Sequence, residues 1–482
     1  MKMKKVSSII LTAAMLLTTA CSDNNTSVTS GTSNKESVDN SGSVSENSSD
    51  ESVTIPNTPN NVDDKLPQCD PANIGDRIGS SGYNSIMKGT DGYYFSMGPW
   101  DEGVQNPDDT PILRYYDTAT QKTIILCSKP QCMHDGNEFC AATSGEWELH
   151  YNCLYNGFIY KIASEVVTEN DMSYHVMKVL RADLQGNELS TLSELFVHHF
   201  SVDIENVVCH YGKMFINMTK AEDGGVRTKH IFIVDLTSGE VKEIAIPDVK
   251  KYNVIPYMTA DGDYLYYAAE DVTWSEDQLK TKIDADTVMH RYNIKTGETE
   301  IISGLPKIYA SFTVNDGIIY YTVADRRENT YSLYSFDTKT SETKTFIDNR
   351  KVDFIDAKYL SSYNKVSVYT DRKYLYVLMG SDSNQYNDEN PYDIDMYIYD
   401  LDGKELYKGL PGIDKERKEW WRYIFSAIDG EIYLYYAVTG NSEGLKDDEV
   451  TGLYMIKAED LINGSTSWTK LYKTSDPFGG MN

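Results

Sequence analysis

The chain has 482 residues, of which 45 are Lys or Arg and 73 are Asp or Glu, giving a formal net charge of −28. This charge argues against nucleic acid as a partner, because phosphate backbones are bound by basic patches. It also argues against attraction to anionic lipid headgroups. The length exceeds one compact core of ordinary size and fits a repeat architecture or two domains.

The first residues have the features of an export signal. Three lysines within MKMKK are followed by a short apolar run, Val6 to Leu17, which is too short for a comfortable transmembrane helix. Small residues then precede Cys21. The pattern resembles a bacterial lipoprotein signal with its lipobox, although Thr18 stands where that family usually has Leu.

The resemblance implies that residues 1–20 are a lipoprotein signal peptide and that Cys21 becomes the lipid-modified first residue of the mature protein. The protein would then be anchored to a membrane of the bacterial cell envelope and exposed outside the cytoplasm. An ordinary secretory signal is the alternative. Residues 21–65 are mostly Ser, Asn, Asp, Thr and Gly, which predicts a disordered tether with a reach of roughly 35–40 Å.

A repeat runs through residues 66–482. Seven segments begin with a turn signal and continue as an aromatic-rich strand: DGYYFSM (Asp91), NGFIYKI (Asn156), YGKMFIN (Tyr211), DGDYLYY (Asp261), DGIIYYT (Asp316), DRKYLYV (Asp371) and DGEIYLYY (Asp429). A second strand with a polar turn follows each one, as in IFIVDLTSGE from Ile231 and LYSFDTKTSE from Leu333. Each repeat therefore holds four short antiparallel strands.

The turn residues and the strand residues both have physical reasons. Asp-Gly and Asn-Gly supply the positive-φ positions of tight hairpins, and alternating aromatic and β-branched residues suit half-buried strands. Four strands every 50 to 65 residues are typical of a propeller blade. We therefore predict an all-β protein, a β-propeller of about seven four-stranded blades, with six or eight as alternatives. Two or three β-sandwiches are the competing architecture.

The repeats, with phrases such as IYY and LYSFD, resemble the bacterial propellers related to the low-density-lipoprotein-receptor-like and TolB-like families. The resemblance spans roughly residues 80–475 and implies a fold more than a function. The cysteine cluster described below is similar to one in uncharacterised lipoproteins of this propeller type. The tryptophan–aspartate, kelch and Asp-box repeats of other propellers are absent from the sequence.

Long acidic segments are predicted to gather on one face of the propeller. They are Gly98–Pro111, Ala269–Thr287, Gly380–Asp395 and Thr439–Val450. Because long loops on a rigid scaffold often carry binding sites, we predict a non-enzymatic binding module for a protein or glycan. The alternative is an extracellular enzyme acting on carbohydrate or peptide, with acidic residues near the propeller axis. No nucleic acid is expected as a partner.

One cluster has metal-ligand chemistry, CSKPQCMHDGNEFC from Cys127 to Cys140. Cys127, Cys132, His134 and Cys140 could complete the tetrahedral shell of one structural zinc ion. A disulfide among these cysteines, with or without Cys69, is the second interpretation, and free thiols are the third. Cys153 and Cys209, at equivalent places in consecutive repeats, are predicted to be buried small hydrophobes.

Overall fold

The computed structural model describes residues 86–97, 112–132, 134, 140–143, 147–169, 172–198, 202–221, 227–247, 254–274, 282–305, 311–325, 330–351, 365–380, 395–409, 420–438 and 452–473. The predicted signal peptide and tether lie outside these residues, as do most of the long acidic segments. Within the described ranges, none of the chain forms a helix with the length and apolar character that a membrane crossing needs.

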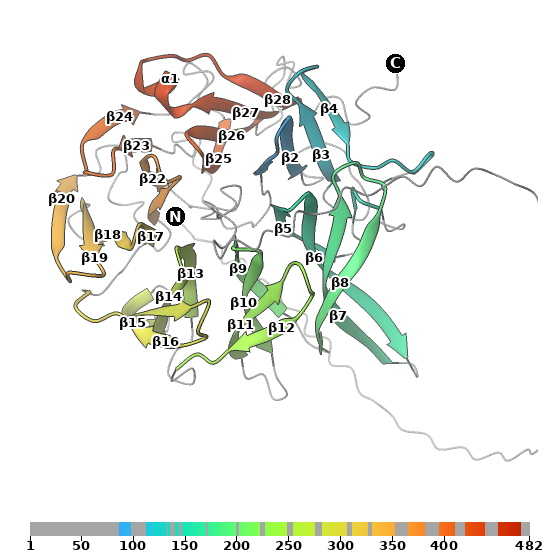
Figure 1. Ribbon diagram of the computed structural model, residues 1–482. Helices are drawn as coiled ribbons and strands as arrows, with labels where there is room; N and C mark the ends of the chain where they lie inside the picture. The colour runs from blue at the N-terminus through green and yellow to red at the C-terminus, as the bar shows by residue number, and fades with distance from the viewer. Residues whose placement is uncertain are drawn as a thin grey trace, which may run out of the picture. The chain divides into compact units, whose positions relative to one another are not determined.

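The described strands form seven four-stranded antiparallel sheets, each built from strands consecutive in the sequence (Figure 1). We number these sheets blades 1 to 7 in chain order. Blades 1 to 4 consist of β1 (Ile86–Lys88), β2 (Gly92–Met97), β3 (Ile112–Asp117) and β4 (Lys122–Ile125); β5 (Trp147–Tyr155), β6 (Phe158–Glu169), β7 (Met172–Asp183) and β8 (Leu189–His198); β9 (Val202–His210), β10 (Lys213–Ala221), β11 (Arg227–Asp235) and β12 (Val241–Ile244); β13 (Val254–Asp261), β14 (Tyr264–Trp274), β15 (Lys282–Asn293) and β16 (Thr299–Ile301).

Blades 5 to 7 continue the series. They consist of β17 (Ser311–Asn315), β18 (Ile318–Asp325), β19 (Thr330–Asp337) and β20 (Thr343–Lys351); β21 (Lys365–Thr370), β22 (Leu375–Gly380), β23 (Asp395–Tyr399) and β24 (Glu405–Gly409); β25 (Trp420–Ile428), β26 (Glu431–Val438), β27 (Gly452–Lys457) and β28 (Thr469–Lys473). A short helix, α1 (Ala458–Ile462), lies between the last two strands.

Neighbouring blades pack face to face and the last blade meets the first. Seven hydrophobic clusters of buried residues lie in the described part of the chain, one between each pair of neighbouring blades, including blades 7 and 1. This is a seven-bladed β-propeller. The predicted fold class is confirmed, and the alternative of separate β-sandwiches is wrong.

The first turn explains the Asp-Gly and Asn-Gly signals of blades 2, 5 and 7. Residues at both central positions have positive φ in several blades, for example Asn156 (48°) with Gly157 (79°) and Asp429 (52°) with Gly430 (81°). This is the backbone of the hairpin turns that match strand twist. Glycine at the second position is required by conformation.

The turn between the third and fourth strands explains the Asp that ends each third strand. Asp117 Oδ1 accepts the backbone N–H groups of Ala119 at 2.8 Å and Thr120 at 3.2 Å. Asp235, Asn293 and Asp337 accept the same two N–H groups, those of the second and third following residues. Asp183 and Asp400 accept those of the second and fourth following residues. In blade 7 the position is Lys457, and the helix α1 replaces the turn.

One predicted loop is shorter than the sequence indicated. The segment Ala269–Thr287 was expected to be irregular, but β14 and β15 remain paired as far as Trp274 and Lys282. Only residues 275–281 of this segment lie outside the described strands. The pairing of β14 with β15 therefore continues through acidic residues, with Asp271 opposite Asp286.

Candidate metal centre

The cysteine cluster lies where blade 1 meets blade 2. Its first cysteine, Cys127, follows Leu126, whose backbone N–H donates to the carbonyl oxygen of Leu113 at 3.0 Å. Ser128 donates to the carbonyl oxygen of Gly186 from its backbone N–H at 2.9 Å and from its hydroxyl at 3.0 Å. Gly186 is in the short turn between β7 and β8. The loop is therefore fastened to a short turn of blade 2.

Gly186 is needed for this close approach. Its φ is +74°, and a Cβ at this position would lie 2.8 Å from the backbone nitrogen of Cys127 and from the carbonyl atoms of Leu126. Real Cβ atoms do not approach backbone this closely. A larger residue at position 186 would push the start of the cysteine loop away from blade 2.

The far end of the loop returns to the same place on blade 1. The carbonyl oxygen of Ala142 accepts the backbone N–H of Leu113 at 2.9 Å, so Leu113 binds both ends of the loop. Cys140 and Thr143 exchange two backbone hydrogen bonds of 3.2 Å each. The backbone thus brings Cys140 near Cys127 without help from an ion.

All four predicted ligands come together. The sulfur atoms of Cys127, Cys132 and Cys140 and a ring nitrogen of His134 lie within 4.8 Å of one another. The Sγ of Cys140 is 3.6 Å from Nδ1 of His134. Tetrahedral zinc, with bonds of about 2.3 Å to sulfur, separates its sulfur ligands by about 3.8 Å. The cluster could hold a metal ion with only small side-chain movements.

Two residues in the left-handed backbone region shape the loop. Gln131 has a φ of 62° and His134 a φ of 54°, and the N–H of Cys132 closes a turn on the carbonyl of Lys129 at 3.4 Å. Non-glycine residues in this region are uncommon and persist where surrounding contacts hold them. In this loop they turn the second cysteine and the histidine back toward Cys127.

The three thiols have different environments. Burial raises the pKa of Cys127 to about 12, although the N–H of Lys129 opposes this rise. Burial also raises the pKa of Cys132. At Cys140, burial acts in the same direction, but hydrogen bonds with His134, with Thr143 and from the backbone outweigh it and lower the pKa to about 6. One thiolate is therefore present at neutral pH, and a bound cation would have to displace two more protons.

The remaining cysteines lie elsewhere. Cys153 and Cys209 are buried in the hydrophobic cluster between blades 2 and 3, as predicted for small hydrophobes. Cys21 and Cys69 lie outside the described residues. Cys127, Cys132 and Cys140 are thiols in this structure, not joined by a disulfide.

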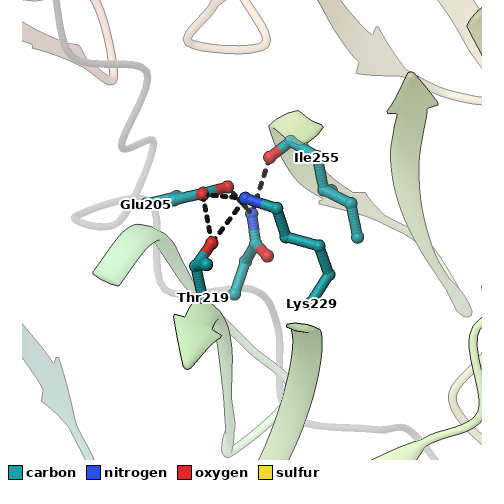
Figure 2. A network of polar contacts seen from close by, with 5 residues as sticks. Glu205, Thr219, Lys229 and Ile255 are labelled. Atoms are coloured by element: carbon teal, nitrogen blue, oxygen red, sulfur yellow. Dashed lines mark hydrogen bonds and ion pairs between the residues drawn. The ribbon is translucent and has the colours of Figure 1, made fainter. Parts of the chain in front are cut away.

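A second polar cluster, which the sequence did not reveal, lies between blades 3 and 4 (Figure 2). Glu205 accepts hydrogen bonds from the hydroxyl of Thr219 at 2.5 Å and from the ammonium of Lys229, which also donates to Thr219. The amide of Asn217 donates to Glu205 at 3.4 Å and to the carbonyl oxygen of Ile255 at 2.7 Å. The side chain of Lys229 is only 8% exposed. This network ties β9, β10 and β11 to the first strand of blade 4, and we assign it to structure.

No protein-family model matches the sequence, and no curated protein sequence matches it either. Among solved structures, the β-propeller domain of the Trilobed protease from Pyrococcus furiosus covers 82% of this chain and 99% of its own length, at 13% identity and a TM-score of 0.44. A prolyl endopeptidase covers 84% of this chain and 50% of its own, at 9% identity and a TM-score of 0.48. The GH93 α-L-arabinofuranosidase of Fusarium graminearum covers 69% and 98%, at 10% identity and a TM-score of 0.37.

At such identities these likenesses concern the fold alone. The described architecture and its cluster define a class: a seven-bladed β-propeller with a Cys3His cluster at the junction of its first two blades.

Proposed function

We propose that this protein is a lipid-anchored binding module of the bacterial cell envelope, whose propeller binds a protein or glycan without catalysis and is stiffened by one structural zinc ion. Cys21 would carry the lipid and residues 21–65 would hold the propeller away from the membrane. The lipobox and the likeness to propeller lipoproteins support this placement.

The proposed binding function rests on the distribution of charge along the chain. The described residues contain 28 Lys or Arg and 35 Asp or Glu, a net −7, whereas the rest of the chain contains 17 and 38, a net −21. Four segments that join the second strand to the third, residues 98–111, 275–281, 381–394 and 439–451, together carry −12. In an antiparallel meander such connections emerge on one face.

This concentration indicates what kind of partner the face would accept. A strongly acidic face on a rigid ring attracts cationic groups and repels anionic surfaces such as the membrane. A basic protein segment, or a glycan carrying amino groups, fits that charge.

The geometry of the cluster supports the zinc ion. Three cysteines and one histidine within 4.8 Å fill four coordination positions, and a Cys3His shell without an open position is typical of structural rather than catalytic zinc. Cys127, Cys132, His134 and Cys140 would hold the ion, which would join the end of blade 1 to the turn at Gly186.

The binding function is tested with a triple variant of one acidic segment, Asp388→Asn, Glu389→Gln and Asp393→Asn. A matched control, Asp402→Asn, Glu459→Gln and Asp460→Asn, removes the same charge from exposed positions on the opposite face. Both are assayed on a glycan array and a basic peptide array. At least tenfold weaker binding for the first variant alone supports the proposal. Equal binding of both variants contradicts it.

Membrane anchoring is tested separately. Labelled palmitate should be incorporated into the wild-type chain in a bacterial host and not into a Cys21→Ser variant. Labelling that survives this substitution, or a wild-type chain released into the medium, contradicts the anchor. Neither outcome bears on binding.

The second candidate is an enzyme acting on carbohydrate or peptide, and one arrangement favours it. His230 Nδ1 is 2.6 Å from Glu243 Oε1, and His230 Nε2 is 2.8 Å from the hydroxyl of Thr228. A hydroxyl, an imidazole and a carboxylate in series are the parts of a nucleophilic hydrolase. Cleavage of the array probes by the wild type and not by Thr228→Val would favour this function over binding.

A further inference from the structure

The cysteine cluster has an accessible half and a protected half. Cys140 is 0% exposed, and its Sγ lies 3.2 Å from the hydroxyl of Thr143 and 3.6 Å from His134. Cys127 and Cys132 are partly exposed. The Sγ of Cys127 accepts a backbone N–H from Lys129 at 3.4 Å. A solute that reaches the cluster from solvent therefore meets Cys127 and Cys132 first.

The two accessible thiols are also placed to react with each other. Four residues separate them, the turn between Lys129 and Cys132 folds them together, and their sulfur atoms lie within 4.8 Å. A disulfide needs about 2.05 Å between sulfur atoms. Rotation of the two side chains covers the difference, since neither sulfur is locked by packing as Cys140 is.

We propose that this loop is a redox switch with two exclusive states: a metal-bound state with all four ligands, and a metal-free state with a Cys127–Cys132 disulfide. This inference rests on the zinc site proposed above. Metal and disulfide, which the sequence left as alternatives, are then two forms of one loop.

The chemistry requires a disulfide oxidant such as oxidised glutathione. Metal binding would already have displaced the protons of Cys127 and Cys132, so both react as thiolates. The thiolate of Cys132 attacks one sulfur of the oxidant, whose disulfide breaks and releases one glutathione thiolate. The thiolate of Cys127 then attacks the mixed disulfide and releases the second. The protein loses two electrons, the oxidant gains two, and the glutathione thiolates take up protons from water. The metal keeps only Cys140 and His134 and leaves as a divalent cation.

The consequence is mechanical. In the metal-bound state the loop joins Ser128, fixed to blade 2, with Ala142, fixed to blade 1. Oxidation leaves the short Cys127–Cys132 ring beside Ser128 and frees His134 from the cluster. The hydrogen bonds of Ser128 to blade 2 and of Ala142 to blade 1 remain, but no ion links the two ends of the loop. The junction between the two blades would loosen without unfolding either sheet.

The test uses the full-length chain loaded with zinc. Oxidised glutathione is added, released zinc is followed with a chromogenic chelator, and disulfides are mapped by mass spectrometry. We expect one zinc released per chain together with one new Cys127–Cys132 bond, and rebinding after reduction. Cys140, Cys153 and Cys209 should remain reduced.

Two variants and two contrary outcomes make the test decisive. Cys127→Ser should form no loop disulfide, and Cys153→Ala should behave as wild type because Cys153 lies outside the cluster. A chain that never binds zinc overturns the zinc site and the switch together. A chain that binds zinc but keeps it, or forms a different pair, overturns the switch alone.

Discussion

Blade 1 has two neighbours, and it is held to them in different ways. Consecutive residues of β2 face opposite sides: Tyr93 packs in the cluster shared with blade 7, and Tyr94 in the cluster shared with blade 2. The first of these clusters has nine buried hydrophobic residues and the second has five, counted over the described part of the chain. The thinner core is on the side of the cysteine loop.

The junction with blade 7 closes the ring without a shared sheet. In the described residues, every strand of blade 1 precedes every strand of blade 7. Side chains make the closure: Glu431 lies 3.1 Å from Lys88 and accepts the hydroxyls of Tyr93 at 3.2 Å and Tyr433 at 2.8 Å. The guanidinium of Arg114 lies 4.6 Å from the ring centre of Tyr472.

The junction with blade 2 combines one buried side-chain hydrogen bond with backbone and loop contacts. Its hydrophobic members include Leu113, Leu126 and Ile159. Its polar contacts include those of Ser128 with Gly186 and the hydrogen bond that the Asn152 amide donates to the hydroxyl of Ser96 at 2.8 Å. A metal at the cysteine loop would stabilise this junction, as the larger apolar cluster stabilises the junction with blade 7. A ring closed by side chains is therefore not held equally at every junction, and the junction with blade 2 has the smaller apolar core.

The largest effect is expected at alkaline pH. Burial raises the pKa of both Tyr93 and Tyr94 to about 12, from an ordinary value of about 10. The folded state therefore holds these protons more tightly, so stability is full below about pH 10 and falls as pH rises toward 12. Each such tyrosine forfeits about 2.7 kcal/mol over that range. Because five others behave alike, we expect cooperative unfolding there.

This unfolding is measured by tyrosinate absorbance together with circular dichroism. Tyr93→Phe and Tyr94→Phe should each shift the midpoint to higher pH by removing one of the ionisable groups. Tyrosines that titrate near pH 10 while the sheet signal persists would contradict the buried environment assigned to them.

Core truncation should separate the two junctions. Phe95 and Leu113 are both 0% exposed, the first in the cluster with blade 7 and the second in the cluster with blade 2. Phe95→Ala should lower the free energy of unfolding by about 3–5 kcal/mol and Leu113→Ala by about 2–5 kcal/mol. Denaturant melts with and without zinc measure both.

The two variants should differ in how much they gain from zinc. An ion that binds only the folded state should stabilise Phe95→Ala as much as the wild type, because Phe95 lies away from the cysteine loop. Leu113 holds both ends of that loop, so Leu113→Ala should bind zinc more weakly and gain less. An equal gain in both variants would contradict a link between the Leu113 core and the metal loop.

Metal removal from the wild-type chain should have a smaller effect. At a free zinc concentration 100 times the dissociation constant, a site present only in the folded state adds about 2.7 kcal/mol. A chelator should therefore lower the melting temperature of the wild type. Cys140→Ser should abolish this response, and Cys153→Ala should retain it. A melting temperature that ignores chelator in the wild type argues against zinc.

The fold was predictable because its signals are local. The Asp-Gly turns, the aromatic strands and the Asp that ends the third strand recur in nearly every blade, and each acts within a few residues. The end of β14 was not predictable, because a strand rich in charged residues has the composition of a loop. The replacement of this turn by α1 in blade 7 was not predictable either. Lys457 stands where the other blades have Asp or Asn, and that difference alone does not predict a helix.

The ligands of the candidate site were predictable from the sequence, but their structural surroundings were not. Cys127, Cys132, His134 and Cys140 were found because their spacing is local to one loop. Gly186, which lets that loop approach blade 2, is 46 residues away from Cys140 and has no signal other than being glycine in a turn. The network of Glu205, Thr219 and Lys229 depends on strand register across three strands, which no sequence spacing encodes.

The smallest effect is expected at the turns between the third and fourth strands, where blade 1 has Asp117 and blade 4 has Asn293. The N–H groups of Ala119 and Thr120 lower the pKa of Asp117, and those of Lys339 and Thr340 lower the pKa of Asp337. A lowered pKa contributes stability above about pH 4 that is lost as pH falls through the folded-state value. Asn293 in blade 4 accepts the same two bonds without a charge.

Asp117→Asn should therefore give the turn of blade 1 the uncharged acceptor that Asn293 provides in blade 4. The turn keeps its acceptor, so the melting temperature at pH 7 should drop by no more than a few degrees. At pH 3 the variant should equal or exceed the wild type, because the wild-type carboxylate has begun to take up its proton there. Melting curves across pH 3–7 measure the slope, which should be flatter in the variant. An unchanged slope would mean that the charge on Asp117 adds nothing to the turn and that the hydrogen bonds alone hold it.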